Sequence, residues 1–316
     1  LDSLLAVCLM KEQGIEVVGV NFTTAFFKGD DKILKAANRL GIELEVLNIQ
    51  AEYIDEVLKN PVHGYGKNFN PCIDCHGFML KKAGLYMQDI NARFLITGEV
   101  LGQRPMSQNK SSLNAADKLS GFRGLILRPL SALLLPVSIP ESEGWVDRDR
   151  LLDISGRGRK RQMELAQKYS IKEYPSPAGG CLLTESNYAK RLKKMLSCQL
   201  AKPDKFDILA VGRHFYFDTT LLVVGRNHSE NLEIEKIATP KDLLLKVMDR
   251  PGPLGMLIFD QHPSPEMLKT AAAVVARYSD AKTEPSCLVK AYRSDVEIVE
   301  VFDVQPLTPQ MTPESV

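Results

Sequence analysis

Apolar and polar positions follow two different rhythms along the first half of the chain. Residues 31–40 carry apolar side chains at helical spacing and are followed by Gly41, which predicts a helix with a glycine stop. Apolar, partly β-branched runs predict strands at 16–22, 44–49, 92–97 and 125–129, and further helices are expected at 4–13, 53–58 and 73–89. This alternation is typical of βαβ units. We therefore expect an α/β domain with a parallel sheet, whose ligands bind beyond the carboxyl ends of the strands.

The pattern changes beyond about residue 155. One more helix is predicted at 161–169, and the residues after 200 contain runs of strands with a helix at 265–278. The expected strands are two within 206–226 and one each at 243–248, 255–259, 287–292 and 297–304. Such a series of strands indicates a smaller α+β domain. We therefore predict two domains, 1–200 and 201–316.

Composition narrows the class of protein. With 316 residues, of which 44% are hydrophobic and 25% charged, the chain is expected to be globular rather than disordered or collagen-like. Its 40 Lys and Arg against 39 Asp and Glu exclude a uniformly basic nucleic-acid binder but not a local basic patch. No long uninterrupted apolar stretch predicts a membrane-spanning helix, and we expect a cytoplasmic protein. The chain begins inside a predicted helix, so we expect further residues before Leu1.

Six cysteines are too few for a secreted disulfide framework, so the CxxC at 72–75 indicates metal, redox or catalytic chemistry. Within NPCIDCH at 70–76, Cys72 and Cys75 lie at the start of a predicted helix, a position that lowers a thiol pKa and favours the thiolate. Four interpretations compete. The first is half of a zinc site, but the sequence has no second CxxC pair to complete it. The second is a thioredoxin-like redox pair, and the third is a haem attachment site, which would require an exported protein. The fourth is a set of catalytic thiolates or iron–sulfur ligands with a partner cysteine far away in the sequence.

The distant partner that we predict is Cys181. Two glycines in the preceding SPAGG sequence at 176–180 allow a close approach of the backbone. The remaining cysteines are expected to be small buried residues, with Cys198 as an alternative fourth metal ligand; they are Cys8, Cys198 and Cys287.

Two further motifs suggest a nucleotide site. The sequence TGEVLGQ at 97–103 is followed by Arg104, Ser107 and Gln108, and a strand that ends in glycine and polar residues is where an α/β enzyme contacts a nucleotide. At the start of the chain, Leu1-Asp2-Ser3 precedes a helix. These three residues are either an ordinary helix cap or the end of a phosphate-binding turn, in which free amides and the helix dipole hold an anion.

In combination, these motifs resemble tRNA-thiolating enzymes over roughly residues 1–185. Residues 97–108 are similar to the TGExLGQxxSQ sequence of tRNA 4-thiouridine synthases, which are PP-loop adenylating enzymes, and Asp2 and Ser3 would end their SGGxDS loop. Cys72 after Asn-Pro and Cys181 after Gly-Gly resemble the cysteines of tRNA 2-thiouridylases. The resemblance implies a Rossmann-like parallel sheet of the adenine nucleotide alpha hydrolase (PP-loop) type. The THUMP and ferredoxin-like segments of full 4-thiouridine synthases are not recognisable here.

The resemblance also implies a chemistry. ATP with Mg²⁺ would activate a uridine carbonyl oxygen by adenylation, and sulfur would then displace AMP. The residues implied to line the nucleotide site are Asp2, Ser3, Gly98, Glu99, Gly102, Gln103, Ser107 and Gln108. For sulfur, two routes are open. In the first, Cys181 carries a persulfide that Cys72 resolves, or the reverse, and Cys75 is a bystander. In the second, Cys72, Cys75 and Cys181 bind three irons of a [4Fe–4S] cluster, and the count of cysteines favours this route.

The last part of the chain resembles, more loosely, the RNA-binding domain of NFACT-type ribosome-rescue proteins, in residues 224–231 and 242–253. Together with local basic clusters, this resemblance predicts tRNA or another RNA as the partner, although a run of charges is usually a solvated helix face. The candidate contacts are Arg157, Arg159, Lys160, Arg161, Lys190, Arg191, Lys193, Lys194, Arg213, His214 and Arg226.

The preferred hypothesis is an ATP-dependent tRNA sulfurtransferase with catalytic Cys72 and Cys181, supplied with sulfur by sulfide or a persulfide-carrying protein. Two alternatives remain. One is a PP-loop iron–sulfur enzyme acting on a small thio-base or other small molecule, and the other is a non-enzymatic RNA- or ribosome-associated protein. Thiolation at ring position 2 or 4 and a homodimer are both left open.

Overall fold

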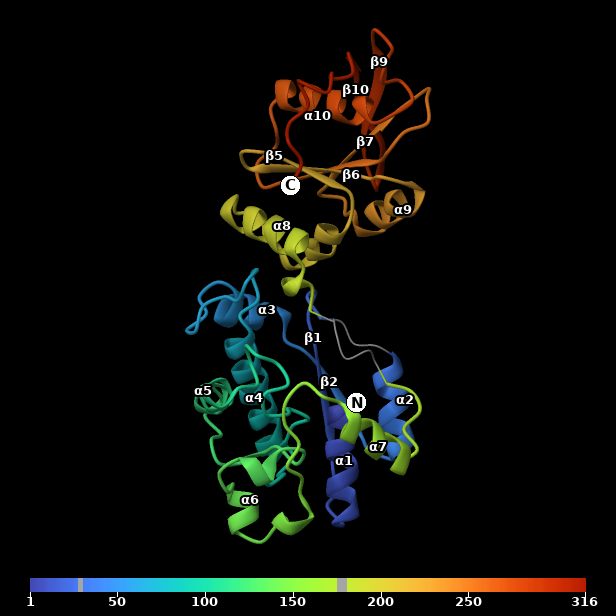
Figure 1. The fold of residues 1–316 in the computed structure, drawn as a ribbon. Coiled ribbons are helices and arrows are strands. Elements are labelled where there is room, and N and C mark those ends of the chain that lie inside the picture. Colours follow the sequence, from blue (N-terminus) through green and yellow to red (C-terminus); the bar gives the residue numbers. More distant parts are fainter. Residues whose placement is uncertain (28–30, 175–180) are drawn as a thin grey trace. The chain divides into compact units, whose positions relative to one another are not determined.

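The structure is a computed structural model that describes residues 1–27, 31–174 and 181–316 (Figure 1). The chain divides into two compact units, Leu1–Leu182 and Leu183–Val316. This division falls before the predicted boundary at 200, because the helix α8 (Ser186–Ser197) bonds to residues that follow it. The Tyr188 hydroxyl donates to the Phe206 carbonyl oxygen at 3.1 Å, and Arg191 donates to the carbonyl oxygens of Leu209 and Gly212 at 2.9 Å each.

The strands of the first unit pair in parallel, as predicted, but in two separate two-stranded sheets. β1 (Gly19–Thr23) pairs with β2 (Leu44–Asn48), and β3 (Leu95–Ile96) pairs with β4 (Ile126–Leu127). A single parallel sheet joining these strands is not formed among the described residues. The second sheet is short because Pro129, which has no amide proton, follows β4, and the chain turns at Gly98 soon after β3.

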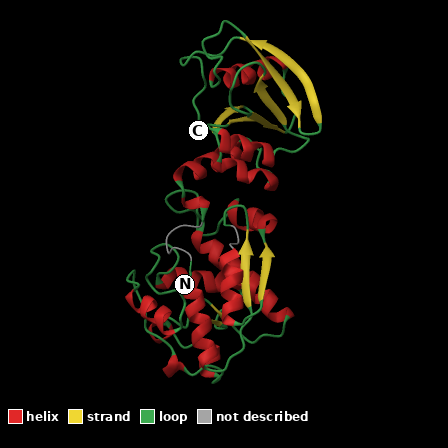
Figure 2. Ribbon diagram, turned by 90° about the vertical axis from the view of Figure 1, so that its right-hand side faces the viewer, coloured by secondary structure: helices red, strands yellow, loops and turns green. Residues whose placement is uncertain are grey.

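The residues of α1 (Asp2–Glu12) from Leu5 to Met10 are all buried and belong to the core of the first unit. Figure 2 shows the helices and strands of the chain in separate colours. Leu5 and Leu9 pack with Leu127 and Leu130. The other helical elements are α2 (Asp31–Leu40), α3 (Gln50–Tyr53), the π-helix η1 (Ile54–Leu58), α4 (Cys72–Asp89), α5 (Lys110–Ser120), η2 (Ala132–Leu134), α6 (Ile139–Ser142), η3 (Arg148–Arg150) and α7 (Lys160–Lys168).

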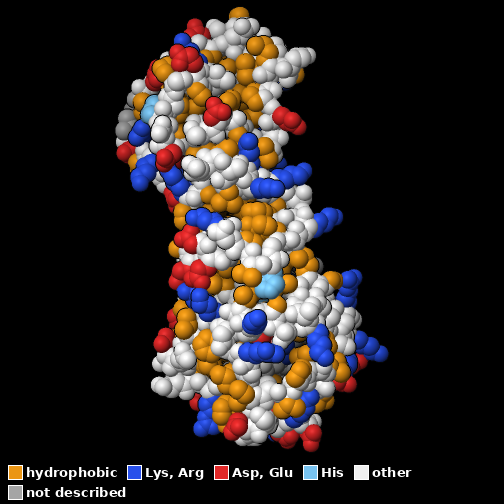
Figure 3. Space-filling model, turned by 90° about the vertical axis from the view of Figure 1, so that its left-hand side faces the viewer, with side chains coloured by type: hydrophobic (Ala, Val, Ile, Leu, Met, Phe, Trp, Pro, Cys, Tyr) orange, Lys and Arg blue, Asp and Glu red, His pale blue; other side chains and the backbone are white. Residues whose placement is uncertain are grey.

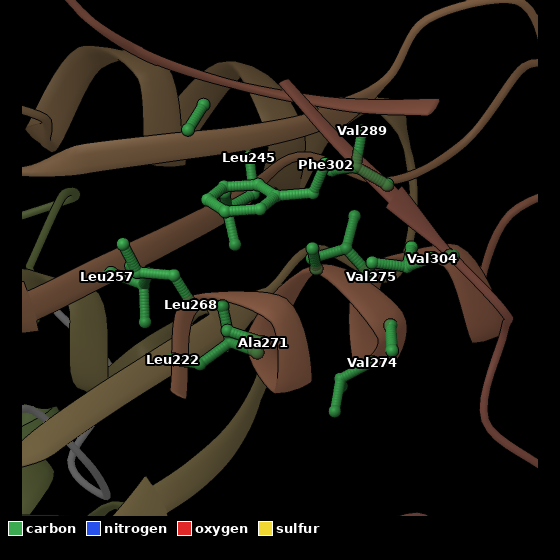
Figure 4. Packing of buried hydrophobic residues seen from close by; sticks show 14 of the residues in the cluster. Leu222, Leu245, Leu257, Leu268, Ala271, Val274, Val275, Val289, Phe302 and Val304 are labelled. Carbon is green, nitrogen blue, oxygen red and sulfur yellow. The ribbon is translucent and has the colours of Figure 1, made fainter. Parts of the chain in front are cut away.

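The second unit is built on a six-stranded antiparallel sheet in the order β10-β9-β7-β8-β6-β5. Its strands are β5 (Arg213–Phe217), β6 (Thr220–Val224), β7 (Leu243–Val247), β8 (Gly255–Phe259), β9 (Cys287–Arg293) and β10 (Val296–Val304). The long helix α10 (Pro265–Arg277) packs against one face, where Val275 and Leu268 meet Leu245, Leu257 and Phe302 (Figure 4). This arrangement confirms the predicted mixture of helix and antiparallel strands.

Three more elements complete the structure: η4 (Leu182–Thr184) at the division between the units in the sequence, η5 (Pro203–Ala210), and α9 (His228–Ile237). η5 occupies the beginning of the segment predicted as two strands, so the first of these strands starts later than expected. Within the described part of the chain, no helix is both long enough and apolar enough to cross a membrane.

Candidate active site

The first turn of α1 lies directly against Gly98. A Cβ atom added at position 98 would lie 2.3 Å from the Ser3 amide nitrogen and 2.5 Å from the Asp2 carbonyl carbon, so the contact requires glycine. The end of the predicted phosphate turn and the start of the predicted nucleotide loop are therefore neighbours, although 95 residues separate Ser3 from Gly98 in the sequence.

Asp2 and the side chains that contact it contain buried polar atoms without a hydrogen-bond partner among the described residues. Gln103 donates from Nε2 to Asp2 Oδ2 at 2.8 Å, and Arg159 Nη2 lies 3.7 Å from Asp2 Oδ1. Within the described residues, Asp2 Oδ1, Gln103 Oε1 and Arg159 Nε are buried and have no hydrogen-bond partner. The fully buried Gln162 on α7 has none for either side-chain atom. Because each such atom costs about 1–3 kcal/mol, this arrangement fits a polar ligand at the α1 N-terminus.

The loop after Gly98 has a fixed shape. The amide of Gly102, a residue with a φ of +76°, donates to the Gln108 carbonyl oxygen at 2.7 Å. The Gly156 amide donates to the Leu101 carbonyl oxygen at the same distance. Ser107 and Gln108 are buried, and Gln108 Oε1 has no partner among the described residues. Gly102 thus shapes the loop rather than offering a side chain.

Glu99 is the centre of a buried charge network. His76 Nδ1 lies 2.6 Å from its Oε1, and Arg128 Nε donates to its Oε2 at 2.9 Å. Burial raises the pKa of this carboxyl, but the His76 hydrogen bond and the Arg128 charge outweigh burial and lower it to about 2. Arg128 in turn forms a two-pronged pair with Asp117, at 2.7 and 3.0 Å. Glu99 is therefore an ionised anchor for His76 and Arg128, whereas the sequence suggested a direct nucleotide contact.

Hydrogen bonds to Asp74 fix the loop that precedes Cys72 and α4. Asp74 accepts hydrogen bonds from the amides of Val62 and His63, at 2.5 and 3.0 Å. In the same loop, Asn70 Nδ2 donates a hydrogen bond to Cys72 Sγ at 3.1 Å. Cys72 is the first residue of α4, so its sulfur has both a side-chain donor and the positive end of a helix dipole beside it.

Cys75 and Cys181 lie around the fully buried hydroxyl of Tyr53. Burial raises the Tyr53 pKa, and Cys75, Cys181 and Cys72 raise it further, in that order. Burial also raises the pKa of the Cys75 thiol to about 12, although the Tyr53 hydroxyl acts in the opposite direction. The three thiols are thus close enough to influence one another. The prediction that both cysteines of the CxxC favour the thiolate is wrong for Cys75, because burial raises the pKa of its thiol although the residue is only partly buried.

A backbone hydrogen bond of Leu182, the residue after Cys181, holds Cys181 near Tyr53. The Leu182 amide donates to the Phe26 carbonyl oxygen at 3.0 Å, and the Phe26 ring lies 5.8 Å from the Tyr53 ring. Residues 176–180, the SPAGG sequence before Cys181, lie outside the described residues.

A metal cluster is not supported by the positions of the ligands. Among the described residues, no three His, Cys, Asp or Glu side chains are arranged so that they could hold a metal ion. All six cysteines are described, and none forms a disulfide. Cys8 is buried as predicted, whereas Cys198 and Cys287 are only partly buried.

The His76–Glu99 bond connects the region of the three thiols with the region around the α1 N-terminus. His76 follows Cys75 in the sequence, and Glu99 follows Gly98, so one short hydrogen bond brings the thiols toward the α1 N-terminus. His76, Tyr53 and Arg128 were not predicted to be site residues from the sequence. The only available signals were the spacing of four residues between Cys72 and His76 and the position of Arg128 at the end of a predicted strand.

The candidate RNA contacts fall into two groups. Several are bound to other parts of the protein: Arg159 faces Asp2, Arg161 pairs with Asp153, Arg226 pairs with Glu230, and Arg213 lies 4.6 Å from the centre of the Tyr278 ring. The exposed candidates that belong to no ion pair among the described residues are Arg157, Lys160, Lys190, Lys193 and Lys194. On the side of the molecule drawn in Figure 3, Lys and Arg side chains are scattered among side chains of other types.

Two candidates in the second unit have structural roles. Arg191 donates to three backbone carbonyl oxygens, those of Leu209, Gly212 and Val316. His214 is fully buried, with Nε2 2.8 Å from the Val211 carbonyl oxygen, and burial lowers its pKa to about 3. The expectation that His214 contacts RNA is therefore wrong for this conformation, because its ring is enclosed.

Comparisons with known proteins agree with both parts of the predicted resemblance. Residues 1–120 match the family model described as the tRNA methyl transferase HUP domain, and residues 212–315 match the NFACT protein RNA binding domain. The chain thus combines a segment similar to a HUP domain of tRNA-modifying proteins with one similar to an RNA-binding domain.

Several curated proteins with similar sequences are named tRNA-specific 2-thiouridylase MnmA. The tRNA-specific 2-thiouridylase MnmA of Lysinibacillus sphaericus is 24% identical over 95% of this chain and 80% of its own length. The protein of that name from Clostridioides difficile is 26% identical over 61% of this chain and 55% of its own. The one from Proteus mirabilis is 31% identical over 37% and 35%.

Solved structures match as well, among them one of a protein from Streptococcus suis. The C-terminal part of the fibronectin/fibrinogen-binding protein from Streptococcus suis aligns with 74% of this chain and 85% of its own, at 14% identity and a TM-score of 0.28. That score is too low to establish a shared fold.

Proposed function

We propose that this protein is an ATP-dependent tRNA sulfurtransferase that replaces a uridine carbonyl oxygen with sulfur carried as a cysteine persulfide. The observation that carries the proposal is the 2.6 Å bond between His76 and Glu99, since it links three neighbouring thiols to the unpartnered polar atoms at the α1 N-terminus. The relatives are named 2-thiouridylases, so we assign the reaction to the carbonyl at position 2 of the uridine.

The α1 N-terminus is the proposed phosphate site. Its free amides, the helix dipole and the Ser3 hydroxyl attract an anion, and Gly98 leaves room for close approach. The unpartnered atoms of Gln103 and Arg159 supply further polar contacts. Mg²⁺ bound with ATP would neutralise charge on the phosphates, and Asp2 Oδ1, which accepts no hydrogen bond among the described residues, would be its ligand.

The proposed reaction has three steps. The uridine oxygen attacks the α-phosphorus of ATP, and pyrophosphate leaves. The terminal sulfur of a persulfide on Cys181 attacks the activated ring carbon, and AMP leaves with the former carbonyl oxygen. The Cys72 thiolate then attacks the Cys181 sulfur, which breaks the sulfur–sulfur bond and leaves the transferred sulfur on the uridine. An external dithiol reduces the resulting Cys72–Cys181 disulfide, and a persulfide-carrying donor reloads Cys181.

Cys72 suits the attacking role better than Cys75. Its sulfur accepts a hydrogen bond from Asn70, whereas burial keeps Cys75 protonated at neutral pH, with a pKa of about 12. Cys72 and His76 are four residues apart on α4, so they share one helix face. With Nδ1 engaged by Glu99, the Nε2 atom of His76 is the ring nitrogen left to take a proton from the Cys72 thiol.

The predicted [4Fe–4S] route is not carried forward, because the described residues do not form a metal site. The persulfide route needs only two thiols in reach of one another. The exposed lysines of α8 and the match of residues 212–315 to an RNA-binding family support tRNA as the partner. We propose that the protein meets its tRNA in the cytoplasm.

A single-turnover assay tests this proposal. The full chain is purified without oxygen, loaded with persulfide, and mixed with ATP and unmodified tRNA. We expect Cys181→Ala and Cys72→Ala to abolish thiolation while ATP binding stays within about twofold. The matched controls are Cys75→Ala, which removes the third thiol of the site, and Cys287→Ala, which removes a thiol of the other unit; both should retain thiolation.

The disulfide that forms during the reaction identifies the thiol that attacks Cys181. Mass spectrometry of the unreduced wild-type product should find Cys72 linked to Cys181. A Cys75–Cys181 link, together with loss of activity in Cys75→Ala, would reassign the attacking thiol. Full thiolation by Cys181→Ala, or a loaded protein with about four irons per chain that loses activity when the iron is removed, would overturn the mechanism.

A further inference from the structure

The sheet of the second unit has two very different faces near β7 and β9. Side chains alternate between the faces of a strand. Leu245, Val247 and Val289 lie in the core that includes α10. The alternate positions, Lys246 and Lys290 among them, therefore lie on the opposite face. This outer face is the strand surface that α10 does not cover.

Two lysines oppose each other on this outer face. Lys246 is directly paired with Lys290 across the β7–β9 ladder. Like charges in directly opposite positions destabilise a sheet. Neither lysine belongs to an ion pair among the described residues. The position therefore carries unneutralised positive charge, which an external anion would relieve.

An aromatic ring lies beside this charge. Tyr292 shares the outer face with Lys290, and the Lys290 ammonium lies 5.0 Å from the centre of its ring. Tyr292 and Lys246 also line a pocket of about 120 Å³, together with Leu232, Glu235 and Leu254. Exposed apolar side chains continue the surface at Leu288 and Val301, which are 41% and 42% exposed.

We infer that this outer face binds a nucleotide of single-stranded RNA, with the base on Tyr292 and its phosphate between Lys246 and Lys290. Sheet faces that combine aromatic rings with basic side chains are suited to unstacked bases, because every base has a face that can stack. The carboxylate of Glu235 at the pocket edge accepts a hydrogen bond from an exocyclic amino group. The inference rests on the proposed RNA partner and names the surface that contacts it.

Binding measurements on the full chain test this surface. The probes are a fluorescent single-stranded oligoribonucleotide and the unmodified tRNA. Since one stacked base contributes about 1–3 kcal/mol, Tyr292→Leu should weaken binding of the oligoribonucleotide roughly 5- to 150-fold. Tyr292→Phe keeps the ring and should bind within about twofold of the wild type. Lys269→Gln removes an exposed lysine of α10 and is the matched control.

The lysines provide an independent readout. Lys246→Gln combined with Lys290→Gln should make the dependence of log affinity on log salt concentration shallower by about 0.7 for a single strand, because the two lysines neutralise one phosphate. Unchanged affinity and slope in both kinds of variant would overturn the inference, as would equal losses in Tyr292→Phe and Tyr292→Leu. Failure of thiolation alone would contradict the proposed function but not this surface, because binding is measured without turnover.

Discussion

Glu99 links stability to pH. Its pKa is about 2 in the folded protein against an ordinary value of 4.5. A carboxyl with a lowered pKa contributes stability that is fully present above pH 4.5 and is lost as the pH falls through about 2. The size of this contribution is about 3 kcal/mol. We expect Glu99→Gln to destabilise the protein at pH 7 by an amount of this order, and urea denaturation at several pH values measures it.

The pH dependence distinguishes this cause from a packing defect. The stability difference between Glu99→Gln and the wild type should shrink as the pH falls from 5 toward 2, because protonation removes the same charge in the wild type. A difference that stays constant over this range would contradict the ion-pair explanation. Asp153→Asn is the control, since the pKa of this carboxyl is also lowered, by Arg161, but the pair is exposed and stabilises little.

This network also shows what sequence patterns cannot predict at the scale of residues. Asp2, Ser3 and Gly98 could be assigned to one site because a motif resemblance joined them. His76, Glu99 and Arg128 lie 23 and 29 positions apart, and no periodic pattern connects such residues. The buried environment that raises the Cys75 pKa is likewise a tertiary effect, which the position at a helix start does not reveal.

At the scale of elements, the contact between α1 and the loop after β3 is the critical one. Gly98→Ala would place a Cβ atom 2.3 Å from the Ser3 backbone nitrogen, so one element must move. We expect ATP affinity to fall by roughly tenfold or more, which corresponds to about 1.4 kcal/mol, together with a lower melting temperature. Calorimetric titration with ATP and thermal denaturation measure the two effects.

The matched control is Gly158→Ala in the segment that leads to α7. A Cβ atom at this position meets nothing within 4 Å, so ATP affinity and melting temperature should be unchanged. Equal behaviour of Gly98→Ala and the wild type in both measurements would show that the close approach is dispensable.

Elements with a clear apolar pattern in the sequence were predictable, and α9 was not. α2 and β8 have the predicted bounds, because helical spacing and a glycine stop mark α2 and an apolar run marks β8. α9 was missed, since Ile234 is its only buried residue and its start depends on an Asn227 side-chain cap. The predicted parallel sheet is confirmed only in part, since the described strands pair in parallel but in two separate sheets, and β3 and β4 contribute only two residues each to theirs.

At the scale of the whole molecule, net charge and local charge lead to different expectations. A net charge of +1 gives almost no overall attraction for RNA, so we expect the proposed tRNA binding to depend on a few exposed lysines. On α8, Lys190, Lys193 and Lys194 are exposed, whereas their neighbour Arg191 is bonded to three carbonyl oxygens. One helix thus carries both candidate RNA contacts and a structural arginine.

Substitution on this helix separates the two roles. Replacing the three exposed lysines by Gln should weaken tRNA binding and make its salt dependence shallower by about 2 to 3 in log–log slope, with melting temperature unchanged. Arg191→Gln leaves buried carbonyl oxygens without donors, so it should lower stability by about 1–3 kcal/mol while the salt slope stays the same. Fluorescence anisotropy at several salt concentrations and urea denaturation measure the two effects. If the triple variant keeps the wild-type slope, α8 does not contact the phosphate backbone, and the RNA-binding surface must lie among the other exposed basic residues.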